Sequence, residues 1–269
     1  MIKHWLITGD THGRTDQRLI NLDTKIYPPD ETAVIILGDA GFNFYFEVSD
    51  ADQFHKRRVD NTGYKVYCVR GNHEDRPENV PGMTTIYDEE VHGYVFRESE
   101  HPNINYFLDG GEYTINNHSV LVIGGAYSVD KWYRIGGKSK ATWTGWFKDE
   151  QLTEDEMDQI TERVAGRAYD FVFTHTCPLD WQPVDLFLRG LDQSTVDNTM
   201  ERWLNELKNK FTWDVWLFGH FHADRLERPH VEMFYRDIED MDVIWDRWHG
   251  EKELDWWLQK SPNYEASSN

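Results

Sequence analysis

Five short segments of this sequence combine glycine with Asp, Asn or His, which are side chains that bind metal ions and transfer protons. In chain order they read GDTHG (9–13), GDAG (38–41), RGNHE (70–74), THT (174–176) and GHFH (219–222). A lone Asp-x-His beside a turn is more often a hydrogen-bonded turn than a metal site. The chemistry therefore depends on whether the five segments meet in space.

Each segment follows an apolar run with the length and the Val, Ile and aromatic content of a buried strand. These runs cover residues 4–8, 33–37, 65–69, 170–174 and 214–218, and a sixth run covers 119–123. They lack polar alternation, which predicts a sheet covered on both faces. Helices are expected between the runs, so the chain is predicted to form an α/β sandwich.

Three helices are predicted, at 50–61, 153–168 and 193–210. The second has Thr153 and Glu156 in the positions of a capping box, which marks a helix start. Beyond Pro229 we expect two further strands, HVEMFYRDI and DVIWD, and then a short helix, GEKELDWWLQK. We predict a single domain over 1–260, in which 229–260 is an aromatic-rich extension, and a flexible tail at 261–269.

Ligands of open α/β sheets bind beyond the carboxyl ends of the strands. The five strand ends bring two Asp, one Asn and five His to one such edge. Carboxylate and imidazole ligands suit Mn, Fe, Zn, Co or Ni, and so many nitrogens argue against calcium. Seven or eight ligands exceed one tetrahedral site, which favours two ions. Two ions about 3.5–4 Å apart are suited to displacement at phosphorus.

Composition restricts the partners and the compartment. The chain has 269 residues and a net charge of −20, which disfavours nucleic acid as a partner because such binding relies on Lys and Arg. Its two cysteines, Cys68 and Cys177, form no metal or disulfide pattern, as expected in a reducing cytoplasm. With no signal-like N-terminus and no run of about 18 apolar residues, we expect a soluble cytoplasmic protein without membrane contact.

Taken in order, the five segments resemble the motifs of the calcineurin-like metallophosphoesterase superfamily, in its bacterial or phage form with serine/threonine-phosphatase-like motifs. The resemblance extends from residue 9 to residue 222. It implies a four-layer sandwich of two mixed β-sheets flanked by α-helices, with a dinuclear metal site at the carboxyl ends of the strands. It also implies two divalent ions, Mn first, with Fe, Zn, Ni, Co or Mg as alternatives.

The resemblance assigns ligands motif by motif. Asp10, His12 and His222 would hold the first ion. Asn72, His175 and His220 would hold the second, and Asp39 would bridge the two. His73 would donate a proton to the leaving alkoxide, while a hydroxide between the metals attacks phosphorus.

The resemblance to the serine/threonine phosphatases is incomplete. Phe42 and Asn43 stand where that branch has the Asp that supports the catalytic His and the Arg that grips phosphate. Protein-phosphatase activity is therefore not implied, whereas phosphoester hydrolysis is. A phosphodiesterase or nuclease is an alternative enzyme, and a catalytically inactive metal-binding protein is an alternative of another class.

Substrate contacts are expected from four basic residues. Arg14 and Arg76 directly follow metal motifs, and Lys131 and Arg134 lie in the segment 124–152, which would either roof the site or pack as an ordinary loop. The expected substrate is a phosphorylated small molecule, a nucleotide or a phosphopeptide. The sequence does not determine the oligomeric state.

Overall fold

Two mixed β-sheets form the centre of the computed structural model, which describes residues 1–45, 49–136, 145–187 and 193–250. The first sheet has the strand order β13-β1-β2-β3-β6-β5-β4. Its strands are β1 (His4–Thr8), β2 (Thr32–Ile36), β3 (Lys65–Cys68), β4 (Met83–Asp88), β5 (Gly93–Glu98), β6 (Ile104–Phe107) and β13 (Glu239–Asp240). The second sheet has the order β11-β12-β10-β9-β8-β7. Its strands are β7 (Gly111–Ile115), β8 (His118–Ile123), β9 (Ala168–Thr174), β10 (Thr212–Phe218), β11 (Arg225–Arg228) and β12 (Val231–Met233).

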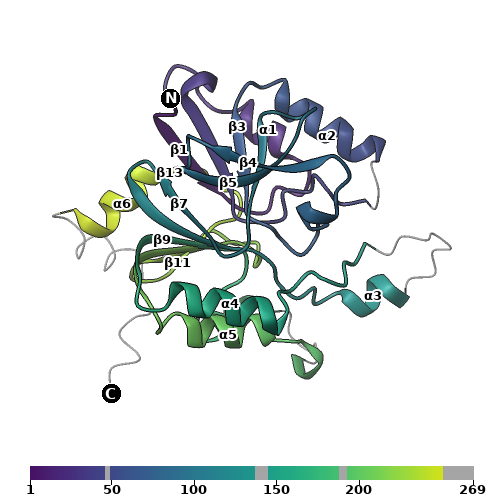
Figure 1. Cartoon of the computed structure of the whole chain (residues 1–269), viewed down its shortest axis with the longest axis vertical. Helices are drawn as coiled ribbons and strands as arrows, with labels where there is room; N and C mark the ends of the chain where they lie inside the picture. The colour runs from purple at the N-terminus through teal and green to yellow at the C-terminus, as the bar shows by residue number, and fades with distance from the viewer. Residues whose placement is uncertain (46–48, 137–144, 188–192, 251–269) are drawn as a thin grey trace.

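Helices cover the outer face of each sheet (Figure 1). Short α1 (Thr15–Leu19) and α2 (Asp50–Asp60) pack on the first sheet, where Leu19 and Val59 join the apolar side chains of β1, β2 and β3. On the second sheet lie α4 (Glu154–Val164) and α5 (Thr199–Leu207), which pack side by side. Because a third apolar cluster fills the space between the sheets, the predicted sandwich of two mixed sheets flanked by helices is confirmed.

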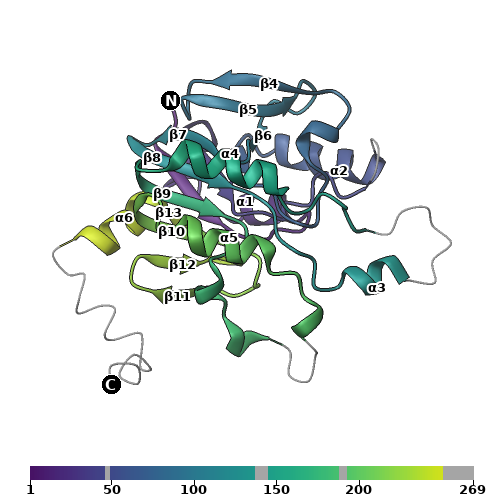
Figure 2. The same cartoon turned by 60° about the horizontal axis from the view of Figure 1, so that its bottom comes forward.

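Two further helices lie elsewhere. The buried side chains of α6 (Met241–His249) join the core between the sheets. In contrast, α3 (Lys131–Gly136) extends away from both sheets, as both views show (Figure 2). The described residues also include five short 3₁₀ helices, Pro29–Glu31, Pro77–Asn79, Leu179–Trp181, Val184–Leu186 and Gln193–Thr195. No helix among the described residues has the length and apolar character needed to cross a bilayer.

The register of the parallel strands aligns their carboxyl ends. Thr8 pairs with Ile36, and Ile36 pairs with Cys68, across β1, β2 and β3. In the second sheet, Thr174 of β9 pairs with Phe218 of β10. The polar segments that follow these strands therefore emerge at the same edge, as the sequence predicts.

Most predicted elements are found within a residue or two of their expected bounds. All six apolar runs are strands, and α4 begins with the predicted capping box. The helix expected at 193–210 instead starts at Thr199, because the carboxylate of Asp197 accepts hydrogen bonds from the backbone and side chain of Thr199 and so sets a turn there.

The strand predicted at DVIWD is wrong. These residues lie in α6, whose buried residues Met241, Ile244 and Trp248 have helical spacing, and the Asp240 side chain caps the helix by accepting from the backbone of Asp242. The strand predicted at HVEMFYRDI is found only in part, as β12. The predicted helix GEKELDWWLQK after Gly250 and the tail 261–269 lie outside the described residues.

Candidate metal centre

Both sheets supply side chains to one cluster of Asp, Asn and His residues at the edge where the parallel strands end. The first sheet supplies Asp10, His12, Asp39 and Asn72 from the loops after β1, β2 and β3. The second sheet supplies His175, His220 and His222 from the loops after β9 and β10. The structure thus brings together all seven of the metal ligands expected from the sequence.

A first group of ligand atoms comes from Asp10, His12, Asp39 and His222, and these atoms all lie within 4.8 Å of one another. The two carboxylates are each 1% exposed, whereas both histidines reach the surface. The Nε2 atoms of His12 and His222 point at each other. Two buried carboxylates and two converging imidazoles form a donor set that fits a divalent ion of the Mn, Fe or Zn type.

A second group forms around the side-chain oxygen of Asn72. Its Oδ1 lies 2.9 Å from His175 Nε2 and 3.1 Å from His220 Nδ1. The other ring nitrogen of His175 donates to the carbonyl of Leu37, which leaves Nε2 as the nitrogen that faces Asn72. A backbone partner of this kind fixes the orientation of a ligating histidine.

Asp39 lies between the two groups. Its Oδ1 is 3.6 Å from His175 Nε2, and the same residue belongs to the first group. The backbone N–H groups of Asn72 and His73 both donate to Asp39 Oδ1, each over 2.9 Å. The carboxylate is thereby held in place by the loop that carries the neighbouring ligand.

The backbone of the ligand loops is strained. Asp10, His12, Asp39, His220 and His222 all have positive φ, between 28° and 68°. Non-glycine residues rarely adopt this left-handed region, and such residues concentrate at functional sites. Five of the seven expected ligands share this property. The loops therefore place these side chains at the expense of a favourable local backbone conformation.

Glycines next to the ligands allow close approach. A Cβ at Gly38 would lie 2.0 Å from His175 Nδ1, and one at Gly71 would lie 2.0 Å from Asp39 Oδ1. A Cβ at Gly219 would lie 2.7 Å from Asp10 Oδ2. Three of the motif glycines are therefore required by the packing of the ligands themselves.

Burial and neighbouring charges set the protonation of the cluster. Burial, with a contribution from Asp39, raises the pKa of Asp10 to about 8. Burial lowers the pKa of His12 to about 4 and lowers the pKa of His220 and His222 as well. These three imidazoles are thus neutral at pH 7, which is the form that binds metals.

His175 differs from the other histidines. Burial lowers its pKa, but the nearby Asp39 carboxylate outweighs burial and raises the pKa to about 9. Burial raises the pKa of Asp39 in turn, but His73 and His175 reverse this and hold it well below its usual range. Without ions, Asp39 and His175 therefore form an ion pair, and a metal cation bound there would displace the proton.

His73, the expected proton donor, lies at the margin of the cluster. Its side chain is 17% exposed, and its Nε2 is 3.8 Å from Asp39 Oδ2. Its ring is 5.7 Å from that of His12. The buried Nδ1 has no hydrogen-bond partner among the described residues. Nε2 is therefore the nitrogen on the side of the ligands.

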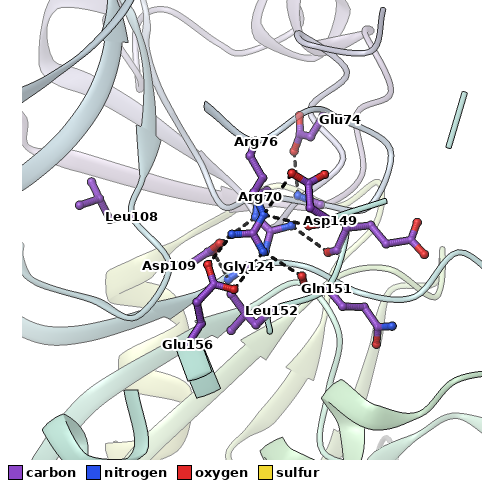
Figure 3. A network of polar contacts seen from close by, with 12 residues as sticks. Arg70, Glu74, Arg76, Leu108, Asp109, Gly124, Asp149, Gln151, Leu152 and Glu156 are labelled. Carbon is purple, nitrogen blue, oxygen red and sulfur yellow. Dashed lines mark hydrogen bonds and ion pairs between the residues drawn. The ribbon is translucent and has the colours of Figure 1, made fainter. Parts of the chain in front are cut away.

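The two arginines that follow metal motifs have different surroundings. Arg14 is exposed, and within the described residues its guanidinium makes no hydrogen bond or ion pair. Arg76 instead binds the Glu156 carboxylate and the carbonyls of Asp149 and Gln151 (Figure 3). These bonds attach Arg76 to the first turn of α4 and to the segment before it, so the structure gives it an anchoring position rather than a free one.

Lys131 and Arg134 lie on α3. Lys131 Nζ is 4.4 Å from the centre of the Trp146 ring. Arg134 pairs with Asp130 over 2.7 Å and donates to the carbonyl of Gly145 over 2.7 Å. No contact within the described part of the chain joins either side chain to the expected metal ligands.

Sequence reasoning missed several residues that support the ligands. Arg18 donates to the carbonyls of Gly9 and Asp10 and so fixes the backbone of the first ligand loop. Ser128 is hydrogen-bonded both to Asn72 and to Glu150. Arg18 lies five residues after the first motif, which is a usable signal, but nothing in the sequence marks Ser128 or Glu150.

A comparison with protein families agrees with this arrangement. The model of the calcineurin-like phosphoesterase family matches residues 4–224, which is most of the chain. No curated protein matches the sequence. The matched region contains every expected ligand and ends before α6.

Proposed function

Because the chain belongs to the calcineurin-like phosphoesterase family, we propose that it hydrolyses phosphate esters at a dinuclear metal centre. Family membership and the cluster of ligands support a metal-dependent phosphoesterase in general. We further propose the number of ions, the roles of single residues and the class of substrate.

In this proposal, Asp10, His12 and His222 hold one ion, Asn72, His175 and His220 hold the other, and Asp39 is shared. The observation that carries it is the position of Asp39, which belongs to the first group and lies 3.6 Å from His175 of the second. When bound, the ions would supply positive charge for the phosphoryl oxygens and lower the pKa of a water nucleophile. We expect Mn, with Fe, Zn, Ni, Co or Mg as possible replacements.

His73 is the proposed proton donor. Its Nε2 is on the side of the ligands, and the backbone N–H of the same residue is fixed by Asp39. A proton held on Nε2 would pass to the leaving alkoxide as the bond to phosphorus breaks, so that the product leaves as a neutral alcohol. Asp39 and His12, which both lie near the ring, would orient it.

Arg14 is the best supported of the proposed phosphate-binding residues, because it is exposed and unpaired within the described chain and follows the ligand loop directly. A guanidinium binds phosphate through paired hydrogen bonds. The proposed substrate is a phosphorylated small molecule, nucleotide or phosphopeptide. A net charge of −20 disfavours long polyanions such as DNA.

The test is hydrolysis of p-nitrophenyl phosphate and bis-p-nitrophenyl phosphate by metal-stripped protein after addition of Mn, Ni, Co, Zn or Mg. We expect activity to return with Mn and to be lost in Asp39→Ala and His73→Ala. The preferred substrate separates monoesterase from diesterase activity. Binding of two ions without turnover of either ester would favour a metal-binding protein that lacks catalysis.

A further inference from the structure

We propose that Ser128 and Glu150 are positioning residues that force the side-chain oxygen of Asn72, rather than its nitrogen, to face His175 and His220. This inference rests on the proposed function, in which Asn72 is a ligand of the second ion. An amide side chain presents an oxygen on one side and an NH₂ group on the other, and only the oxygen can bind a cation. A rotation of the amide by half a turn would destroy the site without moving any other atom.

The hydrogen bonds around Ser128 determine this rotation. Ser128 Oγ lies 2.6 Å from Glu150 Oε2, and Ser128 N donates to Glu150 Oε1 over 3.0 Å. A carboxylate only accepts, so the Ser128 hydroxyl must donate its single proton to Glu150. The oxygen of the hydroxyl then has only lone pairs to offer to Asn72. It lies 2.8 Å from Asn72 Nδ2, which must be the donating NH₂ group.

Burial enforces this direction of hydrogen bonding. Asn72 and Ser128 are each 1% exposed, and Glu150 is 3% exposed. Water therefore has little access to replace a lost partner, and a buried polar atom without a partner costs about 1–3 kcal/mol. The reversed amide would place two acceptors, Asn72 Oδ1 and Ser128 Oγ, against each other.

Two arginines on either side of the GNHE motif fix the backbone at Glu150. Arg70 donates to the carbonyl of Glu150 over 2.8 Å, and Arg76 binds the carbonyls of the residues on both sides, Asp149 and Gln151 (Figure 3). The loop that carries Asn72 therefore also holds the carboxylate that orients Asn72.

Arg70 fixes the other end of the 124–152 segment as well. Its Nε donates to Asp109, whose other oxygen accepts from the backbone of Gly124, and the carbonyl of Arg70 accepts from Gly125 (Figure 3). Ser128 follows these glycines closely in the chain. Hydrogen bonds of Arg70 thus fix both ends of the segment next to the loop that carries Asn72. The segment therefore contributes to the geometry of this ligand.

Glu150→Gln is the sharpest test, because it changes no volume. The backbone N–H of Ser128 must still donate, so the oxygen of the new amide faces it and the NH₂ group faces Ser128 Oγ. The hydroxyl then donates towards Asn72, which must turn its oxygen away from His175 and His220. We expect affinity for the second Mn²⁺ to fall about 10–100-fold in Glu150→Gln and in Ser128→Ala, as is typical when a partner of a metal ligand is lost.

The chain contains a matched control on the paired strands β8 and β9. Ser119 and Asp170 repeat the arrangement, since the backbone and hydroxyl of Ser119 both bond to Asp170 Oδ2, over 2.7 and 2.9 Å. Ser119→Ala and Asp170→Asn remove the same kind of bonds without a link to Asn72. Both controls should bind two ions with wild-type affinity.

A double-mutant cycle with Asn72→Asp separates positioning from general damage. A carboxylate has oxygen on both sides, so its rotation no longer matters, and Glu150→Gln should then reduce second-ion affinity by less than about twofold. The measurement is calorimetric titration of metal-stripped protein with MnCl₂, with the spin coupling of paired ions followed by electron paramagnetic resonance.

Three results are informative. Selective weakening of the second site in Glu150→Gln, absent from the controls and from the Asn72→Asp background, supports the proposal. Wild-type protein that binds two ions while Glu150→Gln and Ser128→Ala bind them equally well overturns this proposal alone. Wild-type protein that binds only one ion overturns both this proposal and the dinuclear centre.

Discussion

The Nε2 atoms of His12 and His222 lie 3.0 Å apart, although the two residues are separated by 210 positions in the chain. Only one N–H can occupy the space between them, so at least one of the two nitrogens presents a lone pair there. Both residues have positive φ. Two strained loops from different sheets thus direct two imidazoles at one point beside the carboxylates of Asp10 and Asp39.

Divalent ions that bind between these side chains should stabilise the folded protein. Addition of Mn²⁺ at about 100 times its dissociation constant contributes about 2.7 kcal/mol, which raises the melting temperature of metal-stripped wild type by about 5–10 °C. Asp10→Asn should lose most of this rise, because a ligand of the first ion is gone. Asp158→Asn, an exposed change on α4, serves as the control. An equal rise in Asp10→Asn and wild type would contradict a role for Asp10 in binding.

Gly38→Ala should abolish the second metal site. The added Cβ would lie 2.0 Å from His175 Nδ1, so the ring must move. A displacement of about 1 Å in a reacting group can reduce the rate about 100-fold, and kcat/KM should fall by at least this amount.

Gly82→Ala is the matched control for backbone strain. Gly38 and Gly82 have similar φ values, +95° and +85°, but a Cβ at Gly82 has no atom within 4 Å. Gly82→Ala should cost only about 1–2 kcal/mol of stability, measured by urea unfolding, and leave the activity unchanged. Equal loss of activity in both variants would show that strain, rather than contact with His175, is responsible.

Replacement by alanine should affect KM at Arg14 but stability at Arg76. Arg14→Ala should raise KM for a phosphomonoester by about 3–10-fold and leave stability unchanged, because its exposed guanidinium is free to bind phosphate. Arg76→Ala should instead lower the free energy of unfolding by about 2–3 kcal/mol, since it breaks charged hydrogen bonds to Glu156 and to the backbone. Urea unfolding and steady-state kinetics of both variants distinguish the two roles.

Lys131 and Arg134 test whether the 124–152 segment binds substrate. If it does, Lys131→Ala and Arg134→Ala should each raise KM several-fold with little change in kcat, since uniform binding is lost. Lys148→Ala, an exposed change later in the same segment, is the control. Unchanged kinetics in both test variants would exclude these side chains from substrate binding.

Glu201 should make stability depend on pH. Burial raises the pKa of its carboxyl to about 6, despite a hydrogen bond from Thr176, and its Oε2 has no partner among the described residues. The folded state therefore binds this proton more tightly than the unfolded chain, whose Glu has a pKa of 4.5. The stability that the proton contributes is fully present below pH 4.5 and is lost as the pH rises through about 6.

Glu201→Gln removes this dependence. At pH 7.5 the metal-stripped variant should be more stable than wild type by about 1–2 kcal/mol, relative to their difference at pH 4. Urea unfolding of both proteins at the two pH values measures the change. A difference that stays constant with pH would mean that Glu201 titrates normally in the folded state.

The strands and the metal ligands were predictable because both rest on local signals. Six apolar runs without alternation gave the buried strands, and the polar segments at their ends gave the cluster, since parallel strands in register end together. The hairpin β4–β5 was missed because buried, half-buried and exposed residues are mixed along it, so its hydrophobic pattern is weak. The helix α6 was missed because a run of five residues, DVIWD, is too short to distinguish the hydrophobic period of a helix from that of a strand.

Apart from Arg18, the support for the ligands was not predictable. Arg76 follows a metal motif, but sequence adjacency does not reveal that its side chain turns away towards Glu156. Ser128 and Glu150 are 22 positions apart, and the contact of Ser128 with Asn72 depends on how the first and second sheets dock. Such contacts arise from tertiary packing, which a single sequence does not encode in any periodic pattern.

The division of the ligands between the sheets has a mechanical consequence. Four of them follow strands of the first sheet and three follow strands of the second. Ions held in common by both sets would act as a clasp across the core, because the sheets could not separate without breaking metal–ligand bonds. Loss of the ions would then speed the opening of the sandwich at this edge, and the lifetime of the folded protein would depend on the metal supply of its surroundings.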